Sequence, residues 1–258
     1  MAQFDNRFAQ QGAYSGAATG IDAGLRSYML GVYNYMAGGV ALTGVVAYLI
    51  HSMAVTTDST QAVAKMGNKL LTPFGQALYG SPLMWVVALA PLAFVFFLSF
   101  RVYKMSVGAA QLSYWLFAAV MGASMSTLLL RYTGQSVAQT FFITATAFGA
   151  LSLYGYTTKK NLSGWGSFLI MGVVGLILAS LVNIFLQSTG MQFAISVLGV
   201  LIFAGLTAYD TQSIKDHYYE VAHDSQLAAK SAIMGALNLY LDFINMFQML
   251  LSLIGNRD

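Results

Sequence analysis

Seven long apolar stretches alternate with shorter polar segments along the chain. Each stretch has about the 20 residues that an α-helix needs to cross the hydrocarbon core of a bilayer. The pattern therefore predicts an all-α membrane protein with seven transmembrane helices in one domain. The predicted spans are 28–50, 83–100, 112–130, 137–155, 166–187, 193–211 and 232–254.

Two of the predicted connections are long, 51–82 and 212–231. The first contains Pro73, Pro82 and several Gly and Thr residues, so we expect it to lie at the membrane surface. The first 27 residues are polar and rich in Gly and Ala, and they lack the regions of a signal peptide. We therefore expect a polar cytoplasmic tail over 1–27 and a transmembrane domain over 28–258.

The composition agrees with a membrane location. The chain is 57% hydrophobic and only 8% charged, whereas a soluble domain carries roughly 25% charged residues. The absence of cysteine excludes disulfides, thiolate catalysis and Cys-based metal sites. The net charge of +3 comes without a basic cluster that contains aromatic residues, so no nucleic-acid partner is predicted.

Lys and Arg residues indicate the orientation, because they are enriched in cytoplasmic loops. With the N-terminus inside, eight lie on the inner side and four on the outer side. The inner residues are Arg7, Arg26, Arg101, Lys104, Lys159, Lys160, Lys215 and Lys230, and the outer ones are Lys65, Lys69, Arg131 and Arg257. Seven spans then place the C-terminus outside. A re-entrant last stretch would return it to the inside.

Two acidic residues lie within the apolar stretches. Residues 161–209 contain no charged side chain and are followed directly by Asp210, and Asp242 is the single charge within 231–256. A carboxylate in hydrocarbon is costly unless it is neutralised, paired or hydrated, so intramembrane acids are usually functional. Because their segments follow one another along the chain, we expect Asp210 and Asp242 to form one site, provided that the sixth helix continues past Lys215.

Polar residues accompany each aspartate at helical spacing, so each set forms a stripe that should face protein or water. These supporting residues are Thr207 and Thr211 beside Asp210, and Asn238 and Asn245 beside Asp242.

Two adjacent carboxylates repel each other, whereas one shared proton gives a short, strong hydrogen bond. Loss of that proton would separate the helices, which makes the pair a candidate pH sensor. The alternative is two acids that are hydrogen-bonded separately for packing. No cofactor or resident metal is predicted, although Asp210 and Asp242 could also handle a cation.

Arg101 ends the second span on the inner side. It could pair with the carboxylates as a removable latch, or it could anchor its helix at the interface.

Besides a pH-sensitive site, three other functions remain open. The first is a secondary transporter, although the chain lacks the internal repeats and helix breaks of that class. Intramembrane aspartyl proteases also place two aspartates on adjacent helices, and Tyr209-Asp210 resembles one of their motifs. The residues before Asp242, however, lack the glycines of the second motif. A non-conducting regulator of another membrane protein is the third alternative. No catalytic residue is predicted, and we do not expect an enzyme.

Three segments resemble the Bax inhibitor-1 family, also called the transmembrane Bax inhibitor motif family, and its bacterial members in particular. They are LSLYGYTTKK at 151–160, FAGLTAYDTQ at 203–212 and ALNLYLDFIN at 236–245. The resemblance extends from about residue 25 to the C-terminus. It implies two three-helix layers around a central C-terminal helix.

The resemblance also implies a function, a pH-sensitive calcium leak that is controlled by a hydrogen-bonded aspartate pair. Asp210 and Asp242 match the two family positions. Arg101 matches, within one residue, an Arg that is implicated in holding the closed state of bacterial relatives. Some bacterial relatives modulate a membrane-bound protease, which implies a possible membrane-protein partner. The basic tail of eukaryotic relatives is missing here, so functions of that tail are not expected.

Overall fold

The computed structural model describes residues 2–257, and it describes side-chain surroundings for residues 23–257. Within this part of the chain, seven helical segments are long and apolar enough to cross a membrane. They cover Ala23–Ala54, Leu83–Lys104, Val107–Arg131, Gly134–Thr157, Ser163–Leu186, Thr189–Val221 and Ser225–Ile254. The prediction of an all-α membrane fold with seven spanning helices is confirmed.

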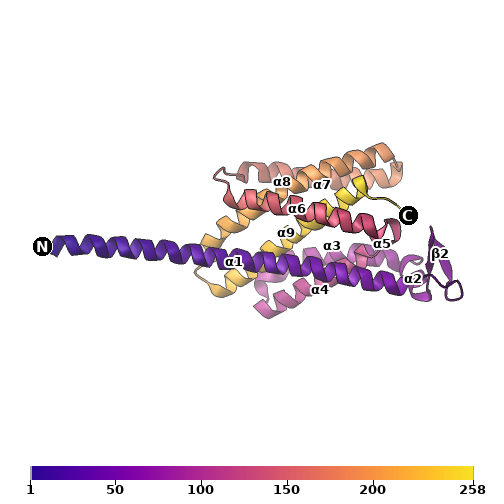
Figure 1. Cartoon of the computed structure of the whole chain (residues 1–258), viewed down its shortest axis with the longest axis horizontal. Coiled ribbons are helices and arrows are strands. Elements are labelled where there is room, and N and C mark those ends of the chain that lie inside the picture. Colours follow the sequence, from indigo (N-terminus) through magenta and orange to yellow (C-terminus); the bar gives the residue numbers. More distant parts are fainter. Residues whose placement is uncertain (1, 258) are drawn as a thin grey trace.

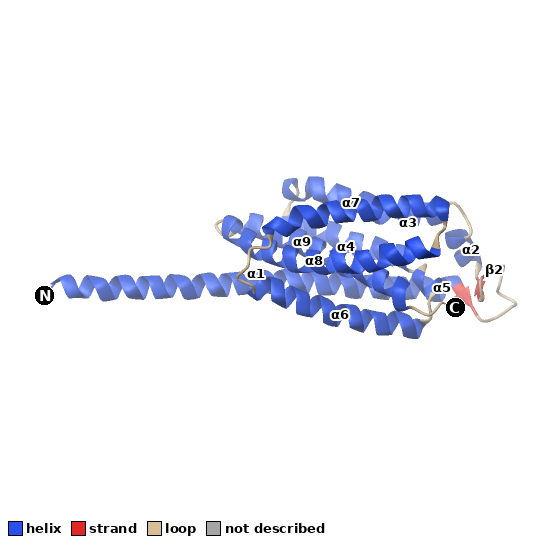
Figure 2. Cartoon of the chain, turned by 90° about the horizontal axis from the view of Figure 1, so that it is seen from above, coloured by secondary structure: helices blue, strands red, loops and turns tan. Residues whose placement is uncertain are grey.

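The helices lie side by side along the long axis of the molecule, and α1 projects beyond the others (Figures 1 and 2). We call the end from which α1 projects the N-terminal end. The opposite end, with the strands and the C-terminus, is the hairpin end. The elements are α1 (Ala2–Ala54), β1 (Val55–Thr56), β2 (Ala64–Met66), β3 (Lys69–Leu71), α2 (Pro73–Tyr79), α3 (Leu83–Arg101), η1 (Val102–Lys104), α4 (Val107–Met125), α5 (Leu128–Arg131), α6 (Gly134–Thr157), α7 (Ser163–Leu186), α8 (Thr189–Val221) and α9 (Ser225–Ile254).

The connection 51–82 has structure of its own. Its three strands form a small antiparallel sheet in the order β1-β3-β2, and α2 follows. The hydroxyl of Thr72 caps α2 by accepting a hydrogen bond from the Gly75 amide at 3.1 Å. The predicted tail over 1–27 lies mostly outside the residues whose side chains are described.

The expected third span, 112–130, is interrupted. It consists of α4 and α5, which are separated at Ser126 and Thr127. Both hydroxyls donate to carbonyl oxygens three residues earlier, at 2.6 and 2.8 Å, and such local bonds compete with the regular helical pattern. Tyr79 on α2 also hydrogen-bonds Ser126 at 2.7 Å, which holds this break at the hairpin end.

The expected long connection 212–231 is wrong. Helix α8 continues to Val221 and α9 begins at Ser225, so only Ala222–Asp224 separates them. The Asp224 carboxylate accepts hydrogen bonds from the Leu227 and Gln226 amides, and these bonds lower the pKa of Asp224. A charged N-cap therefore starts α9 directly after the turn.

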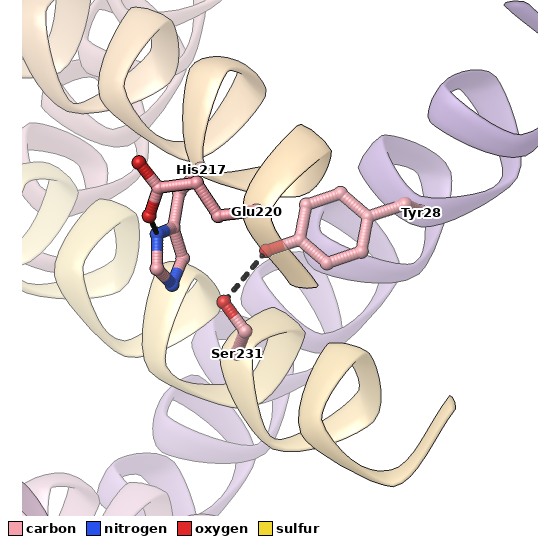
Figure 3. Close-up of polar contacts among 4 residues, drawn as sticks. All are labelled: Tyr28, His217, Glu220 and Ser231. Carbon is pink, nitrogen blue, oxygen red and sulfur yellow. Dashed lines mark hydrogen bonds and ion pairs between the residues drawn. The ribbon is translucent and has the colours of Figure 1, made fainter. Parts of the chain in front are cut away.

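Helix α9 packs among α8, α1, α6 and α4. Tyr240 on α9 donates to Thr43 Oγ1 at 2.6 Å, and Thr43 in turn donates to the Ala118 carbonyl oxygen of α4 at 2.9 Å. Nearer the N-terminal end, Tyr28 on α1 hydrogen-bonds Ser231 on α9 at 3.1 Å (Figure 3). This packing agrees with a central C-terminal helix, while the grouping of the other six helices into two layers stays a prediction.

Helix α9 runs without interruption from the turn at Ala222–Asp224 to the hairpin end. There the Thr133 amide donates to the Asn256 carbonyl oxygen at 3.0 Å. The structure therefore has a full seventh span rather than a re-entrant segment.

Close approach of α6 and α8 depends on Gly155. A Cβ atom at this position would overlap the carbonyl oxygen of Ala208 on α8. Small residues of this kind let the backbones of membrane helices come into contact where lipid gives no hydrophobic drive for association.

We expect Gly155→Ala to lower the midpoint of thermal unfolding in detergent, because the added methyl group would push α6 away from α8. Overpacking of this kind typically costs about 1–3 kcal/mol. Gly149→Ala is the matched control on the same helix, where an added Cβ would meet nothing within 4 Å. Its midpoint should be unchanged or slightly higher, and equal midpoints for the two variants would contradict the close approach.

Candidate functional site

The two intramembrane aspartates meet between α8 and α9. Because α8 continues past Lys215 and the turn after it is short, the two helices lie antiparallel, which brings Asp210 to the height of Asp242. The two carboxyl groups are within hydrogen-bonding contact of each other. Two carboxyl groups hydrogen-bond only when one O–H donates to an oxygen of the other, so a hydrogen bond within this pair requires one proton.

The two carboxyl groups differ in their surroundings. Asp242 is only 4% exposed, whereas Asp210 is partly exposed. Within residues 23–257, Asp242 Oδ2 has no hydrogen-bond partner. A buried charged oxygen without a partner is costly, so the arrangement suits a proton on the pair better than two negative charges.

No cation neutralises the pair in the described part of the chain. On the exposed side of α8, His217 Nδ1 hydrogen-bonds the Glu220 carboxylate at 2.8 Å (Figure 3). Lys215 turns away from the aspartates, since its Nζ donates to the Tyr156 carbonyl oxygen at 3.0 Å.

Arg101 lies at the last residue of α3, where it is exposed. It forms no ion pair with Asp210 or Asp242 among the residues described. The structure therefore does not bring Arg101 to the carboxyl pair, and its role as a latch stays a prediction.

The threonines beside Asp210 are fully buried, and their hydroxyls donate to backbone carbonyl oxygens of the same helix. Thr207 Oγ1 donates to the Phe203 carbonyl oxygen at 2.8 Å, and Thr211 Oγ1 donates to the Thr207 carbonyl oxygen at 2.7 Å. Such bonds satisfy the donor of each hydroxyl within its own helix, and Thr211 Oγ1 also contacts Ser152 on α6.

The asparagines beside Asp242 lie in different surroundings. Asn238 is exposed, and Asn245 is half-buried with its amide donating to the Leu241 carbonyl oxygen at 2.8 Å. The polar stripe of α9 is therefore not uniform, because Asp242 is buried in the protein and Asn238 is exposed.

A hydrogen-bond chain that the sequence did not predict connects α1 to α8 beside the pair. Tyr33 on α1 hydrogen-bonds Ser152 on α6 at 2.6 Å, and Ser152 hydrogen-bonds Thr211 at 2.9 Å. Tyr33 and Ser152 also line a cleft of about 760 Å³ near the N-terminal end, with Arg26 at its edge. The sequence contained one indication of this chain, because Ser152 lies in the family-like segment 151–160.

A second missed residue is Gln212, which fastens α8 to the turn between α6 and α7. Its Nε2 donates to the Lys160 carbonyl oxygen at 2.9 Å, and its Oε1 accepts from the Leu162 amide at 2.7 Å. The segments 151–160 and 203–212, which are far apart in sequence, are thus joined close to Asp210.

The arrangement allows a proton-dependent contact between two helices. Of the residues described, no three His, Asp or Glu side chains lie close enough together to hold a metal ion. Ionisable chemistry at this site therefore comes from the two carboxyl groups. Together with the seven spans, they define a multi-pass α-helical membrane protein with an intramembrane carboxyl pair.

Comparison with known proteins identifies the family. A family model described as inhibitor of apoptosis-promoting Bax1 matches residues 25–258. A Caulobacter vibrioides protein is 48% identical over 260 residues, with full coverage of both chains. The Escherichia coli K12 inner membrane protein YbhL is 43% identical over 236 residues, which cover 91% of this chain and 94% of that protein. The chain therefore belongs to the Bax inhibitor-1 family, as the three motifs predicted.

Proposed function

We propose that this protein is a pH-sensitive calcium leak channel, in which Asp210 and Asp242 form the sensor. The observation that carries the proposal is the direct contact between the two carboxyl groups inside a membrane-spanning bundle. With one shared proton the contact holds α8 against α9. Without it, two negative charges face each other in a medium of low dielectric constant, where their repulsion is strong. A helix contact that depends on a proton is a physical basis for gating.

The proposed location is the inner membrane, with the N-terminus in the cytoplasm. The Escherichia coli relative is named an inner membrane protein. Three of the residues that we assigned to the cytoplasm, Arg101, Lys104 and Lys160, lie at helix ends or turns of the N-terminal end. The opposite C-terminus would then face the periplasm.

The protease alternative has less support. Both aspartates lie within uninterrupted helices, α8 and α9. Peptide hydrolysis requires that an extended substrate backbone and a water molecule reach both carboxyl groups, and Asp242 is 4% exposed. A regulator of another membrane protein would use the same family fold, and we name no surface for it.

Reconstitution of the full chain in liposomes tests the proposal. We expect calcium influx above that of protein-free liposomes, with a rate that changes between about pH 5 and pH 9, the range in which buried carboxyl groups titrate. Calcium uptake would be followed with an entrapped dye while pH is varied on each face separately. Liposomes that stay as tight as empty ones at every pH would exclude the channel.

A double-mutant cycle tests whether the two carboxyl groups act as one unit. We expect Asp210→Asn and Asp242→Asn each to abolish most of the pH dependence of flux, because either change removes one partner of the shared proton. The double variant should add little, since residues in contact are non-additive. Asp216→Asn, at an exposed position on the same helix, is the matched control and should keep the wild-type profile. Effects that simply sum would mean that the aspartates act independently.

Arg101→Ala tests the latch. If Arg101 holds the closed state through charge, the variant should raise calcium flux at the pH where the wild type conducts least, while insertion stays normal. Arg101→Lys keeps the charge and should preserve the wild-type profile. Wild-type flux and pH dependence in Arg101→Ala would assign this residue to membrane anchoring.

A further inference from the structure

A lateral pocket opens on the side of the bundle, between α1 and α6. It has a volume of about 280 Å³ and lies toward the hairpin end, with α9 as its floor. Its lining is apolar apart from two hydroxyls, those of Thr43 and Tyr48. The residues that the argument uses are Thr43, Gly44, Ala138, Phe141, Phe243 and Phe247.

Small residues leave the pocket open. Gly44 on α1 and Ala138 on α6 contribute almost no side chain to opposite walls. A Cβ atom at Gly44 would meet nothing within 4 Å, so the space in front of it is empty of protein. On the far side, Phe141 packs edge-on against Phe243 and Phe247, with ring centroids 5.6 and 6.5 Å apart, which gives the pocket a fixed aromatic wall.

Water is a poor occupant of this pocket. A buried water molecule needs two to four polar partners. Of the two hydroxyls in the lining, that of Thr43 already donates to the Ala118 carbonyl oxygen and accepts from Tyr240, and Tyr48 is an exposed residue of α1. An engineered apolar cavity of roughly 150 Å³ stays dry and binds benzene, and this pocket is larger.

The mouth of the pocket faces the membrane. Tyr48 on α1 and Phe142 on α6 line it, and they are 66% and 70% exposed on helices that span the bilayer. The medium outside is therefore hydrocarbon. Lipid tails are flexible and apolar, and they are present at far higher local concentration than any other apolar molecule.

We propose that this pocket binds one acyl chain of a phospholipid from the leaflet at the hairpin end. The chain fills the space between α1 and α6 and packs on the face of α9 that carries Phe243 and Phe247. Recognition is through the apolar chain, so the site accepts phospholipids with different headgroups. This binding site is separate from the carboxyl pair, and it does not depend on calcium conduction.

Photolabelling tests the proposal directly. The full chain is reconstituted in phosphatidylethanolamine and phosphatidylglycerol vesicles that contain a trace of phospholipid with a diazirine in its acyl chain. After irradiation, labelled peptides are mapped by mass spectrometry. We expect labelling of residues 40–48 and 137–142 to exceed that of the lipid-facing surface of α7 around Phe185, which is 87% exposed and does not line this pocket.

Filling the pocket should remove this excess. Gly44→Leu places a side chain in the empty space, and Ala138→Leu does so from the opposite wall, so both should reduce labelling to the level of α7. Gly31→Leu is the matched control, because it is the same change on the same helix, with nothing within 4 Å of its Cβ and outside the pocket. It should keep wild-type labelling.

Three results would overturn the proposal. The first is labelling of the pocket no stronger than that of α7. The second is equal labelling in Gly31→Leu and Gly44→Leu. The third is a cross-link between two copies of the chain at Gly44 or Ala138, which would show that a second copy covers the pocket.

Discussion

The carboxyl contact between α8 and α9 is the interaction around which the rest of the bundle is arranged. In hydrocarbon an ionised carboxylate without a partner has a high free energy. Asp210 and Asp242 lower this cost when they lie in contact and share a proton. That requires two rigid helices at matched height. The short turn at Ala222–Asp224 and the charged cap that Asp224 gives to α9 provide this geometry.

Residues of the family-like motifs position α8 beside this contact. Gly155 lets α6 approach the backbone of α8. Ser152 and Gln212 then fasten α6 and its following turn to α8 on both sides of the same region. These residues neither titrate nor reach the carboxyl groups. Their effect is to fix where the Asp210 side of α8 lies relative to α6.

Much of the fold was predictable because hydrocarbon imposes a simple pattern. A span needs about 20 apolar residues, and the pairing of Asp210 with Asp242 followed from the cost of isolated charges. The boundaries around 212–231 were not predictable in the same way. That segment contains Lys215 and His217 and therefore looked like a loop, but polar residues at the end of a helix can extend into water. The break between α4 and α5 depends on where the Ser126 and Thr127 hydroxyls turn, and the open position of Asn238 depends on tertiary packing.

Helix α9 is held to its two principal neighbours by different chemistry. Its bonds to α1, from Tyr28 to Ser231 and from Thr43 to Tyr240, join neutral hydroxyls at two heights, so they do not change when a carboxyl group loses its proton. Its polar contact with α8 in the middle of the bundle is the carboxyl pair. At the hairpin end, Gln192 Nε2 of α8 donates to Ser252 Oγ of α9 at 3.3 Å, again without charge. Under the proposed gating, repulsion between the carboxylates would act on two helices that are joined by the turn Ala222–Asp224 at the N-terminal end and by the Gln192–Ser252 bond at the hairpin end, so displacement of α8 from α9 would be largest between these two ends, around the pair itself.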